Sequence, residues 1–224
     1  MKNKYAIFPI TMAGLAFLCF LFLAFQMAIT VQPLWGETMV LILPSLILSV
    51  VAVLAWKGKL DQRMTEFVTC VLSIILVIVS FVYILILSVW TVTTETMDVK
   101  FYTNAYEQIE GRKGVTGIFP DKIPADAGNV EFRYHPSFLQ GGEVLELSYT
   151  TTDDILSDWD VFLRDRAEWV GSDTAWHETN NWFFRGEDST RYQLYWDGGD
   201  NHDEISYVLI DLTQNRITFF YEDW

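Results

Sequence analysis

Three long runs without a charged residue constrain this chain more than any other feature. The apolar part of the first run covers residues 5–29, and the other two cover residues 38–56 and 67–94. A bilayer core about 30 Å thick needs about 20 helical residues, and backbone groups in lipid must be bonded within their own segment. We therefore expect three membrane-spanning helices, at about 5–29, 38–56 and 67–92, within a membrane domain of residues 1–97.

The first run is expected to stay in the protein as a helix. Lys2 and Lys4 precede it, as basic residues precede the apolar region of a signal peptide. However, the run is long for such a region, and Ala24 and Ala28 are four residues apart where a cleavage site has two small residues separated by one.

Basic residues near the helix ends predict the orientation in the membrane. Lys2 and Lys4 precede the first run, the 30–37 loop has no Lys or Arg, and the 57–63 loop has three. We expect a multi-pass protein of the cell membrane with a cytoplasmic N-terminus and an extracytoplasmic C-terminal domain.

The composition of the three spans favours an anchor over a transport pathway. They contain no Asp, Glu, Lys, Arg or His, and ionisable residues inside the membrane usually mark ion or proton pathways. Gln26 is explained by a hydrogen bond between helices. Ser45, Ser49 and Ala52 place small groups on one helix face, which favours close helix packing.

Charge separates the chain into two parts. Residues 1–97 carry five Lys or Arg and four Asp or Glu, whereas residues 98–224 carry 10 and 25. An acidic domain lacks the basic surface that a nucleic-acid-binding protein needs, so we expect no nucleic-acid partner. Both cysteines, Cys19 and Cys70, lie in the spans, so the acidic domain has neither disulfides nor thiolate chemistry.

Residues 119–224 are expected to form an α+β domain after a connector at 98–118. The early part of this connector, Val99–Ile109, is expected either to continue the third membrane helix or to form its own short helix. Alternating or β-branched segments predict strands at 130–135, 143–150, 182–185, 191–196, 205–212 and 216–221. The last two flank the short turn Thr213–Asn215 and are expected to form a hairpin. This order favours a mostly antiparallel sheet with one covering helix.

That helix is predicted from apolar residues at helical spacing over residues 152–169, ending near Gly171. The residues at this spacing are Ile155, Trp159, Phe162, Leu163, Arg166 and Val170, and all but Arg166 form an apolar stripe. Trp159 lies at the centre of the stripe and is expected to be buried against the sheet.

Two short motifs carry a resemblance. The segment Phe119-Pro-x-x-Ile-Pro-x-x-Ala127, together with Phe138-Leu-Gln-Gly-Gly142 and the helix after it, resembles a group of uncharacterised bacterial membrane-anchored proteins with an extracytoplasmic domain. The resemblance covers about residues 115–224. It implies the architecture and brings no activity with it.

The acidic domain offers one candidate metal site. Asp197, Asp200, Asp203 and Glu204 surround two glycines in the segment 197–204, and calcium takes six to eight oxygen ligands from flexible loops. The segment lacks the full EF-hand pattern, and a solvated hairpin loop is the simpler interpretation. A calcium site at these four residues is therefore a hypothesis.

Catalytic motifs are missing from the sequence. His135, His177 and His202 have no metal-ligand spacing, and neither a nucleophile elbow nor a phosphate-binding glycine loop occurs. Trp176, Trp182 and Trp196 are candidates for a carbohydrate platform, although packing within the sheet explains them more simply.

Three functions remain open. The first is a membrane-anchored extracytoplasmic binding module for a protein or envelope partner. The second is a cell-surface hydrolase with paired carboxylates, and the third is an accessory subunit of a membrane complex. The absence of a catalytic constellation favours the binding module.

Overall fold

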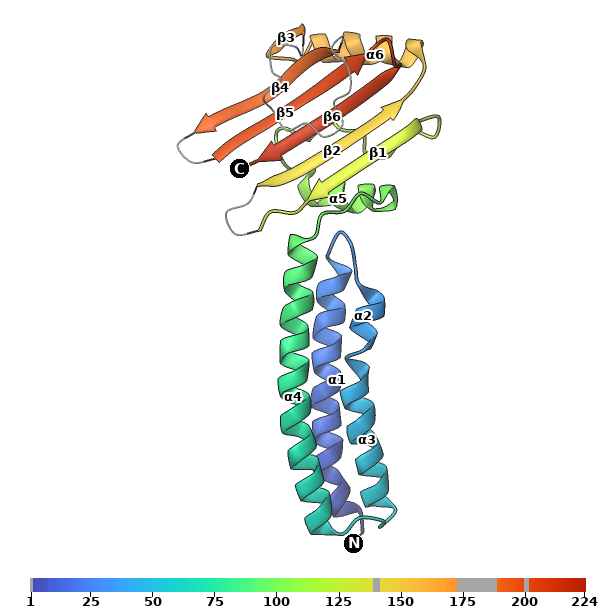
Figure 1. Ribbon diagram of the computed structural model, residues 1–224, viewed down its shortest axis with the longest axis vertical. Helices are drawn as coiled ribbons and strands as arrows, with labels where there is room; N and C mark the ends of the chain where they lie inside the picture. Colours follow the sequence, from blue (N-terminus) through green and yellow to red (C-terminus); the bar gives the residue numbers. More distant parts are fainter. Residues whose placement is uncertain (1, 139–141, 173–188, 200–201) are drawn as a thin grey trace. The chain divides into compact units, whose positions relative to one another are not determined.

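The computed structural model describes residues 2–138, 142–172, 189–199 and 202–224 (Figure 1). The chain divides into two compact units, Met1–Thr91 and Val92–Trp224. The first unit is helical, and the second contains an antiparallel sheet with helices, as the sequence predicts. The strand expected at residues 182–185 lies outside the described residues.

The first unit confirms the three predicted spans, because three helical segments are long and apolar enough to cross a membrane. A 3₁₀ turn precedes them, and a short helix opens the second. The elements are η1 (Lys2–Ala6), α1 (Ile7–Ala28), α2 (Trp35–Met39), α3 (Ile42–Trp56) and α4 (Gln62–Thr93).

The second span is broken between α2 and α3, at Val40 and Leu41. Pro44 lacks an N–H group, and its ring disfavours the helical position of the carbonyl four residues earlier, which belongs to Val40. The Val40 carbonyl instead accepts a tighter hydrogen bond from the Leu43 N–H, at 3.1 Å. The proline therefore causes a break rather than the kink that a helical proline often produces.

Small and polar side chains line the buried side of α4. Thr65, Thr69, Ser73 and Ser80 are all buried among the helices, where small groups allow close approach. The hydroxyl of Ser88 lies 3.3 Å from Gln26 Oε1 on α1, which confirms the expected hydrogen bond between helices.

The second unit contains one six-stranded sheet in which every neighbouring pair of strands is antiparallel (Figure 1). The spatial order is β1-β2-β6-β5-β4-β3. The strands are β1 (Gly128–His135), β2 (Glu143–Thr150), β3 (Trp169–Ser172), β4 (Thr190–Gly199), β5 (His202–Asp211) and β6 (Arg216–Asp223). The predicted hairpin of β5 and β6 is confirmed, with Asn215 in the left-handed conformation in its turn.

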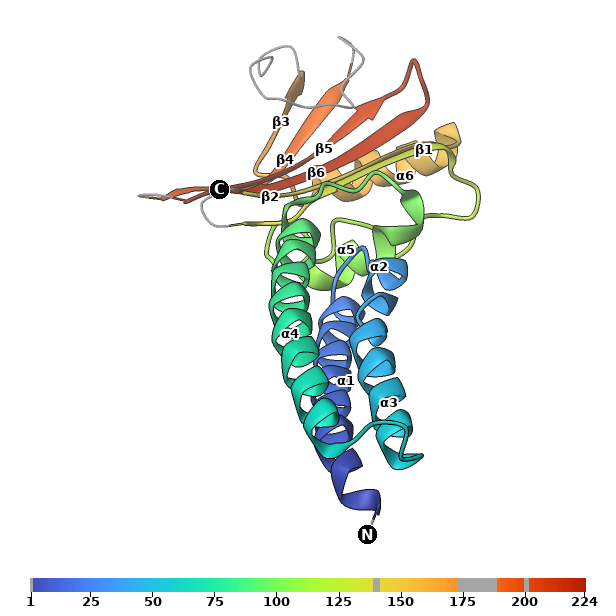
Figure 2. The same ribbon diagram turned by 60° about the horizontal axis from the view of Figure 1, so that its bottom comes forward.

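Two helices, α5 (Tyr102–Ile109) and α6 (Asp153–Arg164), cover the same face of this sheet (Figure 2). Tyr102 of α5 packs edge-on against Phe132, with 5.7 Å between ring centroids. Trp159 of α6 packs edge-on against Phe219, at 5.1 Å. Cross-strand pairs place Phe132, Leu147 and Phe219 on this face, which we call the helix-covered face.

The opposite face is also buried at its centre. Val144, Tyr207, Leu209 and Phe220 form a second apolar cluster there. The rings of Tyr207 and Phe220 stack 4.6 Å apart, and the guanidinium of the fully buried Arg191 lies 3.7 Å from the centre of the Tyr207 ring.

The prediction for the covering helix is wrong at its C-terminal end. Helix α6 ends at Arg164, and residues Trp169–Ser172 form β3 instead of a further helical turn. The Glu168 N–H donates to the Gln193 carbonyl at 2.8 Å, so pairing with β4 replaces helical bonding. Val170 therefore belongs to a strand.

The buried side of α6 also differs from the predicted stripe. Leu156 and Leu163 are its fully buried residues, whereas Trp159 is half-buried. Trp159 contacts Phe219 of the sheet as expected, but it is partly exposed rather than fully buried.

The segment 98–118, expected as a connector, is part of the folded unit. It contains a 3₁₀ turn, η2 (Val99–Phe101), and the short helix α5. Tyr102, Ala105, Ile109 and Val115 are almost completely buried. Of the two alternatives for Val99–Ile109, the structure shows a separate short helix rather than a continuation of α4. The rest of the segment packs as part of the folded unit rather than serving as a connector.

The outer edge of β1 is occupied at one point by the chain that follows α4. Thr96 and Tyr134 form an isolated antiparallel bridge, with two backbone hydrogen bonds of 2.9 Å. Next to it, Arg133 Nε donates to Glu95 Oε1 at 2.9 Å. These contacts fix the start of the second unit to its sheet.

Candidate functional site

The predicted calcium ligands lie at the ends of β4 and β5. Asp197 pairs across the strands with Glu204, and Gly198 pairs with Asp203. Because successive residues of a strand point to opposite faces, Asp197 and Glu204 share the helix-covered face, while Asp203 lies on the other.

Asp200 lies outside the described residues. In the parts of the chain that the structure describes, no three acidic, histidine or cysteine side chains are arranged to hold a metal ion. The calcium site at Asp197, Asp200, Asp203 and Glu204 stays a prediction that needs a direct binding measurement.

A charged network has a structural role on the helix-covered face, at the end of the sheet that carries Asp197 and Glu204. Arg112 Nη1 donates to Asp223 Oδ2 at 2.8 Å and Nη2 to Glu143 Oε2 at 3.3 Å. The Tyr134 hydroxyl donates to Glu143 Oε1 at 2.6 Å, and burial raises the pKa of Tyr134. Both carboxylates are therefore occupied in holding the loop after α5 against β2 and β6.

The opposite face presents a different set of groups at this end of the sheet. Trp196 pairs across the strands with Ile205, and Ile205 pairs with Glu222. Directly paired residues share a face, so these three side chains form one row across β4, β5 and β6. Trp224 joins the row, because its side chain hydrogen-bonds the Glu222 carboxylate. We call these four residues the tryptophan row.

Both tryptophans of the row are widely accessible. Trp196 is 61% exposed and Trp224 is 57% exposed. A side chain on Gly198 would place its Cβ 3.3 Å from the Trp196 ring, and one on Gly142 would lie 3.2 Å from the Trp224 ring and 2.5 Å from the Asp223 carbonyl. The two glycines thus leave room for the indoles to lie close to the backbone.

Glu222 gives the row a carboxylate in an apolar setting. Burial raises the pKa of Glu222 above the ordinary range of a glutamate, against the opposing effects of the Trp224 hydrogen bond and the Arg133 charge. Glu146 shares this face, since it pairs with Phe220, but it is completely buried, with Arg133 Nη1 3.6 Å from its Oε2.

The row suits recognition by contact. Indole faces bind apolar surfaces, cations and the faces of sugar rings, and the carboxylate of Glu222 accepts hydrogen bonds or, when protonated, donates one. Trp196, a candidate for a carbohydrate platform, is accessible as that hypothesis requires. Trp176 and Trp182 lie outside the described residues.

Sequence reasoning missed Glu222 and Trp224 as partners of Trp196. Residues 222–224 follow the predicted last strand directly, and only the register of β6 against β5 shows that Glu222 is aligned with Ile205. The alternation of residues between the two sheet faces continues past Tyr221, and this pattern was the signal that could have placed Glu222 and Trp224 on one face.

Comparisons with protein-family models, with curated proteins and with solved structures found no match to this chain. The resemblance noted for residues 115–224 therefore stays an expectation, and the residues of the tryptophan row carry the functional interpretation.

Proposed function

We propose that this protein is a membrane-anchored binding module whose sheet domain lies outside the cytoplasm and holds a protein or envelope partner at the tryptophan row. The three spans anchor it in the bilayer. The observation that carries the proposal is the exposure of two tryptophans, Trp196 and Trp224, on one sheet face, where Trp224 also hydrogen-bonds the Glu222 carboxylate.

The energetic argument concerns apolar area. A tryptophan side chain has about 150–250 Å² of surface to bury, and leaving more than half of it in water forgoes a large stabilisation. Tryptophan is also the residue type most enriched among the residues that dominate binding energy. Two such side chains in one row support a surface that is completed by a partner.

The orientation is part of the proposal. The N-terminus and the 57–63 loop, which has three basic residues, lie at one end of the helical unit (Figure 1), whereas the 30–37 loop has no Lys or Arg. The positive-inside rule supports a cytoplasmic location for the basic loop, and three crossings then place the sheet domain outside the cytoplasm.

A surface hydrolase is the main alternative. It needs two carboxylates that face a common substrate. On the face of the tryptophan row, Glu222 is half-buried and Glu146 is completely buried. On the helix-covered face, Glu143 and Asp223 are held by Arg112. These arrangements favour binding over hydrolysis.

A photo-crosslinking experiment in intact cells tests the proposal. A benzophenone amino acid replaces Trp196 in the full-length protein, and Val161, which is 69% exposed on α6, serves as the matched control position. We expect a discrete crosslinked product from position 196 and none from position 161.

A second substitution links the product to the row. Trp224→Ala in the crosslinker background should weaken partner binding about 30-fold, the effect of losing a dominant tryptophan contact of about 2 kcal/mol, and should remove the product. Equal products from positions 196 and 161, or a product that Trp224→Ala leaves unchanged, would overturn the proposal.

A further inference from the structure

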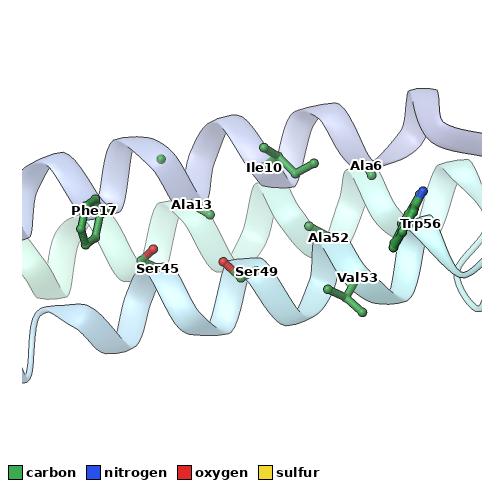
Figure 3. A pocket seen from close by; sticks show the side chains of 10 residues that line it. Ala6, Ile10, Ala13, Phe17, Ser45, Ser49, Ala52, Val53 and Trp56 are labelled. Carbon is green, nitrogen blue, oxygen red and sulfur yellow. The ribbon is translucent and has the colours of Figure 1, made fainter.

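We propose that the helical unit binds an anionic phospholipid, with one acyl chain in a groove between α1 and α3 and the head group at a cluster of lysines. The groove has a volume of about 580 Å³. Figure 3 shows it between the two helices, with Ala6 and Trp56 at one end and Phe17 and Ser45 at the other.

The groove exists because small residues face each other where α1 and α3 pack together. Ala13 and Gly14 lie on α1, and Ser45 and Ser49 lie on α3 with their hydroxyl groups directed toward α1 (Figure 3). A Cβ added at Gly14 would have no neighbouring atom within 4 Å. The helices therefore approach closely and still leave an open channel along their seam.

The dimensions fit an acyl chain. From Ala6 to Phe17 the groove follows eleven residues of helix, or about 16 Å at 1.5 Å per residue, which matches the roughly 15 Å depth of one leaflet of a 30 Å hydrocarbon core.

The groove suits a single hydrocarbon chain. Its volume is about 580 Å³, and it runs along one seam between two helices, so one acyl chain can lie along it. A helix of a second copy is the alternative occupant, and it would leave the lysines at the end of the groove without a role.

The charge at one end selects the head group. The groove ends at Ala6 and Trp56, and the exposed Lys4, Lys57 and Lys59 lie within three residues of these two positions. Asp61, the acidic residue of the same loop, accepts the Met64 N–H at 2.7 Å. Lysines beside the membrane attract anionic lipids, by about fivefold for each one, and Trp56 suits the interface.

Native mass spectrometry of the full-length protein tests the site. The protein is purified in detergent and mixed with phosphatidylglycerol or phosphatidylcholine that carry identical acyl chains. We expect the wild type to retain phosphatidylglycerol at least fivefold more than phosphatidylcholine.

Two kinds of variant separate the parts of the site. Gly14→Leu fills the groove and should reduce retention of both lipids at least fivefold, whereas Thr11→Leu, at an exposed position of α1 outside the groove, should change neither. Replacing Lys4, Lys57 and Lys59 together by Gln should remove the preference for phosphatidylglycerol and keep the retention of phosphatidylcholine. Ser49→Leu repeats the groove test if Gly14→Leu fails to fold.

Three results would overturn the proposal. The first is equal retention of the two lipids by the wild type. The second is a Gly14→Leu or Ser49→Leu protein that folds and retains lipid like the wild type. The third is a wild-type dimer that Gly14→Leu converts to a monomer without any change in lipid retention, because the groove would then hold a second copy.

Discussion

Phe219 is the residue on which the core of the helix-covered face depends most. It is completely buried on the central strand β6, and three aromatic rings surround it: Trp159 at 5.1 Å, Phe119 at 5.5 Å and Tyr149 at 6.0 Å between centroids. Phe→Ala changes in cores cost about 3–5 kcal/mol. We expect Phe219→Ala to reach the upper part of that range, about 4–5 kcal/mol, because rigid rings on three sides cannot collapse into the cavity.

Two matched substitutions set the scale. Trp159→Ala removes a larger side chain that is partly exposed, so a cost below that of Phe219→Ala is expected, about 3 kcal/mol. Val161→Ala lies on the same helix, 69% exposed, and should stay within about 0.5 kcal/mol.

The assay is pulse proteolysis of the full-length protein in detergent micelles across a urea gradient, scored by the loss of the sheet domain. If Phe219→Ala leaves no folded domain, Phe219→Leu gives a measurable step of about 1–2 kcal/mol. A cost for Trp159→Ala equal to or above that for Phe219→Ala, or a cost above about 1 kcal/mol for Val161→Ala, would refute the assignment of the core.

Three further predictions concern charge, orientation and metal. Glu222→Gln should raise the urea midpoint at pH 7. The folded pKa of Glu222 is raised, so ionisation of this carboxyl destabilises the folded state as pH rises above the unfolded pKa of about 4.3. The gain from the substitution should shrink as pH falls to about 4, and a gain that stays constant with pH would contradict the raised pKa. An impermeant thiol reagent should label a cysteine at Val161 but not one at Lys59 in intact cells, and the reverse pattern would invert the orientation. Calcium at tenfold excess over its Kd should add about 1.4 kcal/mol to the free energy of unfolding and should therefore raise the melting temperature at fixed ionic strength. Asp200→Asn with Asp203→Asn should abolish that shift.

The membrane spans and most strands could be predicted because their signals are local. An uncharged run of 28 residues has few outcomes other than a spanning helix, and alternation in residues 143–150 is typical of a strand wherever its partners lie. The end of α6 was not predictable in this way. Arg166 and Val170 continue the helical spacing, but the Gln193 carbonyl, far along the chain, takes the Glu168 N–H.

The candidate site depended on non-local register. Trp196 is visible in the sequence as an aromatic residue near the end of a strand, but its neighbours across the sheet, Ile205 and Glu222, follow from pairings of β4 with β5 and β5 with β6. A shift of one residue in either pairing would move Glu222 to the other face. Packing of the 98–118 segment was hidden for a related reason, since its glycines suggest a loop and its contacts with the sheet are distant in sequence.

The position of β6 has a consequence for the order in which the sheet forms. This strand is the last of the six strands in the described residues but lies between β2 and β5. It is therefore paired on both sides, although 65 residues separate its first residue from the end of β2. Until it arrives, the β1–β2 and β4–β5 hairpins each expose an unpaired inner edge, which is a template for association with other chains. Pairings of this range form slowly, because the entropy of closing the loop is lost before the contacts compensate. We therefore expect association between chains to compete with folding during the interval before β6 joins the two hairpins.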